Sequence, residues 1–261
     1  MQAEERHFTL RLAQDSRDLA AAQRLRYRVF VQELGADGPL VDHQAQLERD
    51  AFDAVFDHLL LIVTRRDSAA LEDVVGVYRL LPGDKLTEGQ RFYSEDEFDL
   101  TALRATGRKL LELGRSCVHI DYRGGSAMLH LWNALAEYVL ARGIEVMFGA
   151  ASFHGTDVQA LAQPLAYLHH KHLAPEALRV RAIGPNAQPM DLVPEAALDR
   201  RAAMLGTPAL IKAYLRLGGF VGDGAYIDHA FNTTDVCLVM DTGLMSARHR
   251  QFYERKKAPE A

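Results

Sequence analysis

The sequence predicts an α/β fold in which helices flank a twisted, mixed β-sheet. Short apolar runs with β-branched residues alternate with amphipathic helical patterns along the chain. Residues 110–152 read as strand, turn, helix and strand, a unit whose two strands are expected to run parallel. The 261 residues, 48% of them hydrophobic, suffice for a large core in one domain.

The N-terminal part combines a helix with several strands. Residues 15–34 have helical periodicity, with Asp15 or Ser16 as the N-cap and Gly35 as the stop. Three runs with strand character are found at 7–13, 58–66 and 74–82. Because only a polar stretch separates the second run from the third, we expect these two to be adjacent strands of a meander.

The central unit begins with a strand at 109–120 that contains the polar residues Glu112 and Arg115. In a regular strand their side chains would point to opposite faces. Gly114 indicates a β-bulge between them, which would bring both to one side. The apolar periodicity of residues 126–142 then predicts a helix with Ser126 as its N-cap.

Composition excludes several classes of protein. With 30 basic and 35 acidic residues the formal charge is −5, so no nucleic acid is expected as a partner. The two cysteines, Cys117 and Cys237, are far apart and lack metal-ligand spacing, which favours reduced thiols in a cytoplasmic protein. No run of 18 apolar residues indicates a membrane span.

Four fragments resemble the acyl-homoserine-lactone synthases, members of the GNAT superfamily of acyltransferases, in order and approximate spacing. They are "LRYRVFVQELG" (25–35), "ERDAFD" (48–53), "GVYRLLPG" (76–83) and "ELGRSCV" (112–118). Other fragments resemble the ornithine N-acyltransferases of ornithine-lipid synthesis more closely: "FDHLLLIV" (56–63), "LWNALAEYVL" (131–140), "FGAASFHGTD" (148–157) and the segment 208–240. The resemblance extends from about residue 24 to 240 and implies a GNAT-type sheet with a C-terminal extension.

The resemblance implies a reaction between an amine and a thioester. A 3-hydroxyacyl chain would pass from the phosphopantetheine thioester of acyl carrier protein to the α-amine of L-ornithine, giving lyso-ornithine lipid without a bound cofactor or metal. Glu112 is the expected general base, because an apolar setting would raise the pKa of its carboxyl group toward the working range. Glu48 is the alternative base, and Arg115 is the third catalytic candidate. Pairing of Glu112 with Arg115 is the structural alternative.

Five further residues are expected to bind the amino-acid substrate. Asp50 and Asp53 would bind its ammonium groups, unless they only cap their loop. Arg26 and Arg79 would either clamp its carboxylate or hold the two aspartates in place. His58 matches the ornithine-acyltransferase pattern and would discriminate the substrate, although a histidine at a strand edge explains it nearly as well.

The turn before the 126–142 helix is the expected donor site, formed by Arg123, Gly124, Gly125 and Ser126. Users of acetyl-CoA in this superfamily carry glycines where this chain has Ser126 and Met128. The change disfavours a CoA pyrophosphate and agrees with acyl carrier protein, whose arm carries a single phosphodiester. The basic residues expected to contact that acidic partner are Arg104, Arg108 and Lys109, or those of the stretch 247–257.

We expect a single domain over 1–240, of which 174–240 is an added segment, followed by a basic tail at 241–261. A helix at 207–220 would line the acyl tunnel or touch the inner face of the cytoplasmic membrane, with core packing as the alternative. Two other functions fit the sequence. One is another acyl-carrier-protein-dependent synthase of N-acyl amino acids or homoserine lactones, and the other is a non-catalytic, membrane-associated lipid-binding protein.

Overall fold

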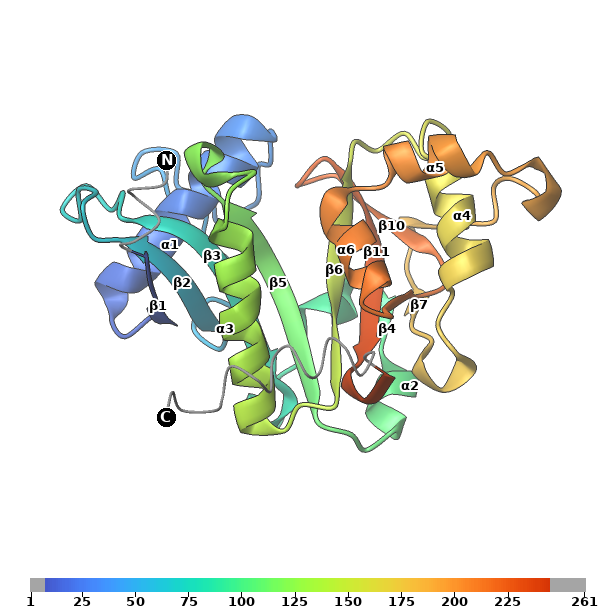
Figure 1. Cartoon of the computed structure of the whole chain (residues 1–261), viewed down its shortest axis with the longest axis horizontal. Helices are drawn as coiled ribbons and strands as arrows, with labels where there is room; N and C mark the ends of the chain where they lie inside the picture. The colour runs from blue at the N-terminus through green and yellow to red at the C-terminus, as the bar shows by residue number, and fades with distance from the viewer. Residues whose placement is uncertain (1–7, 245–261) are drawn as a thin grey trace, which may run out of the picture. The chain divides into compact units, whose positions relative to one another are not determined.

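The structure, a computed structural model, describes residues 8–244 (Figure 1). These residues form two compact units, which are described separately below. The first unit contains residues 8–81 and 113–143, and the second contains residues 82–112 and 144–244. The single domain expected over 1–240 stays a prediction.

The described elements follow one another in mixed α/β order. Strands are β1 (Phe8–Leu12), β2 (Asp57–Val63), β3 (Val74–Pro82), β4 (Phe98–Asp99), β5 (Leu110–Val118), β6 (Val146–His154), β7 (Arg181–Ala182), β8 (Ala187–Gln188), β9 (Phe220–Val221), β10 (Ala225–Asp228) and β11 (Thr233–Asp241). Helices are α1 (Ser16–Arg26), α2 (Thr101–Ala105), α3 (Ala127–Arg142), α4 (Ala162–His172), α5 (Arg200–Gly206) and α6 (Ala209–Arg216).

The strands form a large mixed sheet. Its order is β1-β2-β3-β5-β6-β11-β10-β8, and β9 pairs with β11 beside β10. The parallel pairing of β5 with β6 covers Leu110 to Glu112. The predicted mixed sheet flanked by helices is confirmed, and so is the parallel strand–helix–strand unit.

The first unit has the antiparallel meander expected from the sequence, β1-β2-β3. Helix α1 packs Ala22 and Leu25 against Leu60 and Ile62 on one face of these strands. Helix α3 covers the other face, where a Cβ atom on Gly76 would lie 2.9 Å from Leu131 (Figure 1). Glycine at position 76 therefore lets α3 approach the sheet closely.

Helix α1 begins as expected but does not continue as one regular helix. The side chain of Asp15 accepts a hydrogen bond from the backbone N–H of Asp18 at 2.8 Å, so Asp15 is the N-cap. Residues Tyr27–Glu33 are π-helical, and Gly35 ends the element with φ +77°. The expected α-helix over 15–34 is thus an α-helix followed by a π-helical segment, a feature that apolar spacing does not specify.

The second unit is built on β6, β11 and β10, which are antiparallel neighbours. The sequence of the acidic run 94–99 within this unit predicts a solvated surface, but the run is partly buried, with Ser94, Glu97 and Phe98 inside. The run folds into a 3-10 turn, Tyr93–Asp96, and the short strand β4, so that its residues do not all face one way. That expectation is wrong for these three residues.

Among residues 8–244 no helix combines the length and hydrophobicity needed to cross a bilayer. Both cysteines are buried free thiols, as expected. Helix α6 occupies part of the predicted 207–220 helix, with Pro208 at its start and Gly218 just beyond its end. Strand β11 ends at Asp241, one residue beyond the predicted domain boundary.

Candidate active site

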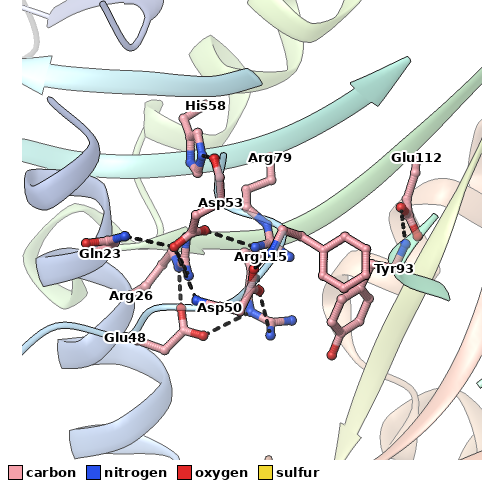
Figure 2. Close-up of polar contacts among 11 residues, drawn as sticks. Gln23, Arg26, Glu48, Asp50, Asp53, His58, Arg79, Tyr93, Glu112 and Arg115 are labelled. Carbon is pink, nitrogen blue, oxygen red and sulfur yellow. Dashed lines mark hydrogen bonds and ion pairs between the residues drawn. The ribbon is translucent and has the colours of Figure 1, made fainter. Parts of the chain in front are cut away.

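Six charged side chains predicted as site residues come together in the first unit, and this group is called the arginine–carboxylate cluster (Figure 2). Its members are Arg26 from α1, Glu48, Asp50 and Asp53 from the loop before β2, Arg79 from β3 and Arg115 from β5. Three cations thus face three anions. The sequence suggested this arrangement as one of two alternatives for the arginines.

Asp53 is the most densely bonded carboxylate of the cluster. It accepts two hydrogen bonds from Arg26, at 2.5 and 3.3 Å, and one from Arg79 at 3.1 Å. Gln23, which sequence reasoning missed, donates a further one at 2.8 Å. Gln23 is one helical turn from Arg26 on α1, so the i, i+3 spacing was the signal available in the sequence.

Asp50 and Glu48 link the remaining arginines. Asp50 pairs with Arg79 at 2.5 Å and with Arg115 at 3.3 Å. Glu48 bonds to Arg26 and lies 3.4 Å from Arg115. The side chains of Asp50 and Arg115 are 16% and 11% exposed, more than those of the other four members. A ligand in solvent therefore meets Asp50 and Arg115 first.

The cluster keeps its carboxylates ionised. Burial alone would raise the pKa of Glu48, but the charges of Arg26 and Arg115 outweigh it and hold that pKa below the usual range. The pKa values of Asp50 and Asp53 are lowered in the same way, chiefly by Arg79 and Arg26 respectively, against the effect of burial. A carboxylate of lowered pKa accepts protons poorly, which argues against Glu48 as a general base, and the choice between Glu48 and Glu112 stays a prediction.

His58 serves the same loop. Its Nε2–H donates to the backbone oxygen of Asp53 at 3.0 Å, in the tautomer that a carbonyl acceptor requires. Burial lowers the pKa of the His58 imidazole, so the ring is neutral at pH 7. Its position on β2 therefore fixes the backbone that carries Asp53, while the predicted role in substrate discrimination stays a prediction.

Strand β5 is irregular where a bulge was expected at Gly114. Arg115 adopts φ +48°, a left-handed conformation that is uncommon for a residue with a side chain. Its side chain reaches Glu48 and Asp50, and these ion pairs oppose the local strain. The irregularity predicted from the glycine is thus present one residue later.

Glu112 lies on β5 in the second unit, with 1% of its surface exposed. One carboxylate oxygen accepts the backbone N–H of Tyr93 at 2.8 Å (Figure 2). The other accepts the backbone N–H of Ser94 at 2.6 Å. Burial disfavours the charged form, whereas two backbone donors favour it. The predicted base is therefore an oriented carboxylate. Nothing in the sequence near Tyr93 signals these two amides.

The predicted donor turn precedes α3 in the first unit. Arg123 donates to the backbone oxygen of Val118 at 2.8 Å and pairs with Glu33 at 2.7 Å, so its guanidinium group already has protein partners. Gly124 has φ +77°, and both Gly124 and Gly125 are exposed. Ser126 holds the N-cap position, but its backbone is helical rather than extended. Donor binding by these residues stays a prediction.

Two of the basic residues expected to contact an acidic carrier protein already form ion pairs within the second unit. Arg104 pairs with Glu95 at 2.7 Å, and Arg108 pairs with Asp241 at 2.6 Å. Because each has an acidic partner, these two arginines offer less net charge than the sequence indicated. The basic stretch 247–257 lies outside the described residues.

Known proteins share both the sequence and the fold. A family model described as an acetyltransferase (GNAT) domain matches residues 25–133. An L-ornithine N(alpha)-acyltransferase of Rhodobacter capsulatus is 62% identical over 95% of both chains. One of Brucella abortus is 40% identical over 94% of this chain and 88% of the relative. The chain belongs to the L-ornithine N(alpha)-acyltransferase family.

A solved relative shares the architecture of this family member. An N-acyl amino acid synthase, FeeM, from uncultured soil microbes superposes with a TM-score of 0.52 at 11% identity, over 94% of this chain and 96% of that one. At this identity the likeness shows the fold alone, which is that of GNAT-type acyltransferases. The resemblance predicted from the sequence is thereby confirmed, and the chain is an N-acyltransferase by family.

The two aspartates of this acyltransferase are expected to differ in their effect on stability. Asp53→Asn should lower the free energy of unfolding by about 3 kcal/mol, since it leaves Arg26 buried with one anion fewer. Asp50→Asn should cost only about 1 kcal/mol, because that carboxylate is partly hydrated. Urea unfolding of both variants measures the difference. Equal losses of unfolding free energy in the two variants would show that Asp50 and Asp53 stabilise the fold equally.

Proposed function

We propose that this chain transfers a 3-hydroxyacyl group from the phosphopantetheine thioester of acyl carrier protein to the α-amine of L-ornithine, forming lyso-ornithine lipid. Its 62% identity with the Rhodobacter capsulatus acyltransferase over nearly the whole chain carries the proposal. The reaction forms an amide C–N bond and breaks the thioester C–S bond. The phosphopantetheine thiol is the leaving group.

Glu112 is the proposed general base. The amine must lose a proton as it attacks the carbonyl carbon, and a carboxylate fixed by two backbone N–H groups is oriented to receive it, directly or through a water molecule. Glu112 shares strand β5 with Arg115, the third proposed catalytic residue. The lowered pKa of Glu48 makes it the less suitable base.

The arginine–carboxylate cluster is proposed to contribute to substrate binding through its most exposed members. Arg115 offers a planar guanidinium group to a carboxylate, and Asp50 offers a carboxylate to an ammonium group. Arg26, Asp53, Arg79 and His58 are nearly enclosed, so their proposed contribution is to hold these two groups in place. The donor turn Arg123–Ser126 is proposed to receive the phosphodiester of the carrier.

The experiment that tests the proposed function is incubation of the purified chain with labelled L-ornithine and 3-hydroxyacyl carrier protein. A product with the mass of N-acylornithine, whose δ-amine still reacts with an amine reagent, supports the proposal. Acylation of homoserine lactone or of another amino acid in preference to ornithine would replace the substrate. Lipid binding without any acylated product would make the chain a binding protein.

The proposed donor leads to a prediction about salt. Because Ser126 and Met128 stand where acetyl-CoA users have glycines, acyl carrier protein should be used at least about tenfold better than acyl-CoA of the same chain. The advantage should shrink as the salt concentration approaches 1 M, where the Debye length is about 3 Å. Ratios of kcat/KM for the two donors at several salt concentrations measure the effect.

Charge reversal locates the source of that preference. Arg248→Glu with Arg250→Glu, in the basic tail, should raise the KM for acyl carrier protein and leave the KM for ornithine unchanged. Arg65→Glu, on an exposed residue of the first unit, is the control for a change in net charge. Equal use of both donors at low salt would refute the preference.

Because the proposed product is a lipid, we also propose that the protein is cytoplasmic and makes peripheral contact with the inner face of the cytoplasmic membrane.

A further inference from the structure

One stretch of the second unit carries only positive charge. Residues 200–222, which include helices α5 and α6, contain four basic residues and no aspartate or glutamate (Figure 1). The basic residues are Arg200, Arg201, Lys212 and Arg216. The chain as a whole has 35 acidic and 30 basic residues, so this stretch departs from the average. No carboxylate of residues 8–244 lies within ion-pair distance of these four cations, so the described part of the chain does not neutralise them.

Helix α5 has one side against the protein and another in solvent. Ala203 is buried, and a Cβ atom on Gly206 would lie 3.3 Å from Pro164 of α4, so this side packs on α4. Arg201 and Leu205, which are four residues apart and therefore neighbours on the helix surface, are exposed. Leu205 is 75% exposed, the largest fraction of any large apolar residue that the structure describes. An apolar side chain thus projects into solvent beside a cation.

Helix α6 adds two cations next to this side chain. Its apolar side, with Ile211 buried, contacts strand β11. Lys212 and Arg216 are the charged residues of the helix, and their spacing of four places them along one side, where Arg216 is exposed and Lys212 half-buried. The Lys212 ammonium group donates to the backbone oxygen of Met204 at 3.0 Å. This bond places a cation of α6 beside the residue that follows Met204, which is Leu205.

The charge of this region is complementary to that of an anionic bilayer. Peripheral proteins bind such a bilayer when apolar side chains enter the headgroup region and basic side chains approach the lipid phosphates. Leu205 supplies the apolar side chain, and the four basic residues supply the charge. A single exposed leucine is common on protein surfaces and by itself needs no explanation. Its location among cations without acidic partners is what indicates a lipid surface.

A bilayer explains the shape of this region better than an acidic protein partner does. The other exposed residues near Leu205 on α5 include Ala202 and Gly206, which are too small to form the wall of a recess. Leu205 therefore stands out from the helix. A protein partner would need a closely matching recess to bury this side chain. The headgroup region of a bilayer is fluid and accepts a projecting side chain without such a recess.

We propose that the exposed sides of α5 and α6, called the α5–α6 surface, bind an anionic membrane. Leu205 enters the headgroup region, and the basic residues of the two helices lie near the lipid phosphates. The inference rests on the proposed function, whose lipid product belongs in a membrane, and extends it by assigning the residues that make the contact. Helices of seven and eight residues are too short to cross a bilayer, so they lie on its surface.

The test measures binding of the full chain to lipid vesicles by sedimentation, without substrates. Vesicles that contain the anionic lipid phosphatidylglycerol should bind the wild type at least about tenfold better than vesicles of phosphatidylcholine alone, and salt should reduce the difference. Arg200→Gln with Arg201→Gln should weaken binding to the anionic vesicles about 25-fold, because each basic residue near an anionic surface contributes about fivefold. Leu205→Ser should weaken it about threefold or more.

Two variants outside the α5–α6 surface are the matched controls. Arg65→Gln with Lys85→Gln removes two positive charges at exposed positions, and Leu140→Ser changes a leucine of α3 that is 41% exposed. Both should bind anionic vesicles as the wild type does. Equal losses in the controls and in the α5–α6 variants would overturn the inference, and so would full binding by all the α5–α6 variants.

Acylation assays without vesicles separate a lipid surface from a contact with the carrier protein. The α5–α6 variants should keep the wild-type KM values for acyl carrier protein and for ornithine, which also shows that they are folded. A raised KM for acyl carrier protein with unchanged vesicle binding would make this surface a carrier contact and overturn the inference. A wild type that acylates ornithine but does not bind anionic vesicles refutes this inference alone. A wild type that binds the vesicles but does not acylate ornithine refutes the proposed function instead.

Discussion

Glu112→Gln is expected to lower kcat about 10²-fold or more while the chain stays folded. Glutamine matches glutamate in size but cannot take a proton from the attacking amine. Its amide oxygen can still accept one backbone N–H, whereas its NH₂ group meets the N–H of Tyr93 or Ser94. Some loss of stability, about 1–3 kcal/mol, is therefore expected beside the loss of turnover.

The dependence of kcat on pH distinguishes a base from a structural carboxylate. In the wild type kcat should fall at acidic pH as Glu112 becomes protonated, and in the variant this acidic limb should disappear from the residual activity. A purely structural residue would lower the rate without removing the limb. Glu88→Gln, the same change at an exposed position of the same unit, is the control. Turnover near the wild-type rate in Glu112→Gln would remove Glu112 from the role and leave Glu48 as the candidate.

Much of the fold could be predicted because its signals are local. Asp15 precedes a stretch in which apolar residues recur about every 3.6 residues, as in a helix, and its side chain caps α1. The end of α3 at Gly143, with φ +63°, follows from the same kind of local pattern. The π-helical turn that begins at Tyr27 could not be predicted, because the apolar spacing of an α-helix and of a π-helical continuation is too similar over seven residues.

The candidate site was predictable in its membership but not in its pairing. Resemblance to known acyltransferases selected Arg26, Asp53 and Arg79, but two alternatives remained for the arginines. Contacts between residues 26 and 27 positions apart pair both arginines with Asp53, and no local pattern encodes such contacts. The amides that orient Glu112 are 18 and 19 residues away from it, in a segment without strong periodicity.

Three neighbouring carboxylates of the second unit, Glu97, Asp228 and Asp235, show a different limit of sequence reasoning. Glu97 belongs to a run of acids, and such runs usually form solvated surfaces. In the structure the run turns within a few residues, so that Asp96 stays outside and Glu97 is enclosed. Asp228 and Asp235 are seven residues apart and meet only because a hairpin joins β10 to β11. A register, rather than a motif, brings these carboxylates together.

Arg26→Met should produce the largest loss of stability among the substitutions considered, about 3–5 kcal/mol. Methionine fills a similar space but removes the cation that bonds to both Glu48 and Asp53, two carboxylates that are almost completely buried. Of their ion pairs, Glu48 would then keep the one with Arg115, and Asp53 would keep the one with Arg79. Arg24→Met, on the same helix, is the matched control, because Arg24 bonds to Gln46 and to backbone oxygens rather than to a carboxylate.

The dependence of stability on pH reports the same interaction. The pKa of Asp53 is lowered in the folded protein, so its contribution to stability is fully present above its unfolded pKa, near 4, and is lost as the pH falls below it. Arg26→Met should raise that folded pKa, and the free energy of unfolding should therefore fall less between pH 5 and pH 2 than in the wild type. Urea unfolding across this range measures both curves. Parallel curves for wild type and variant would mean that Arg79 and Gln23 suffice to hold Asp53 ionised, and that Arg26 stabilises the first unit by packing rather than by charge.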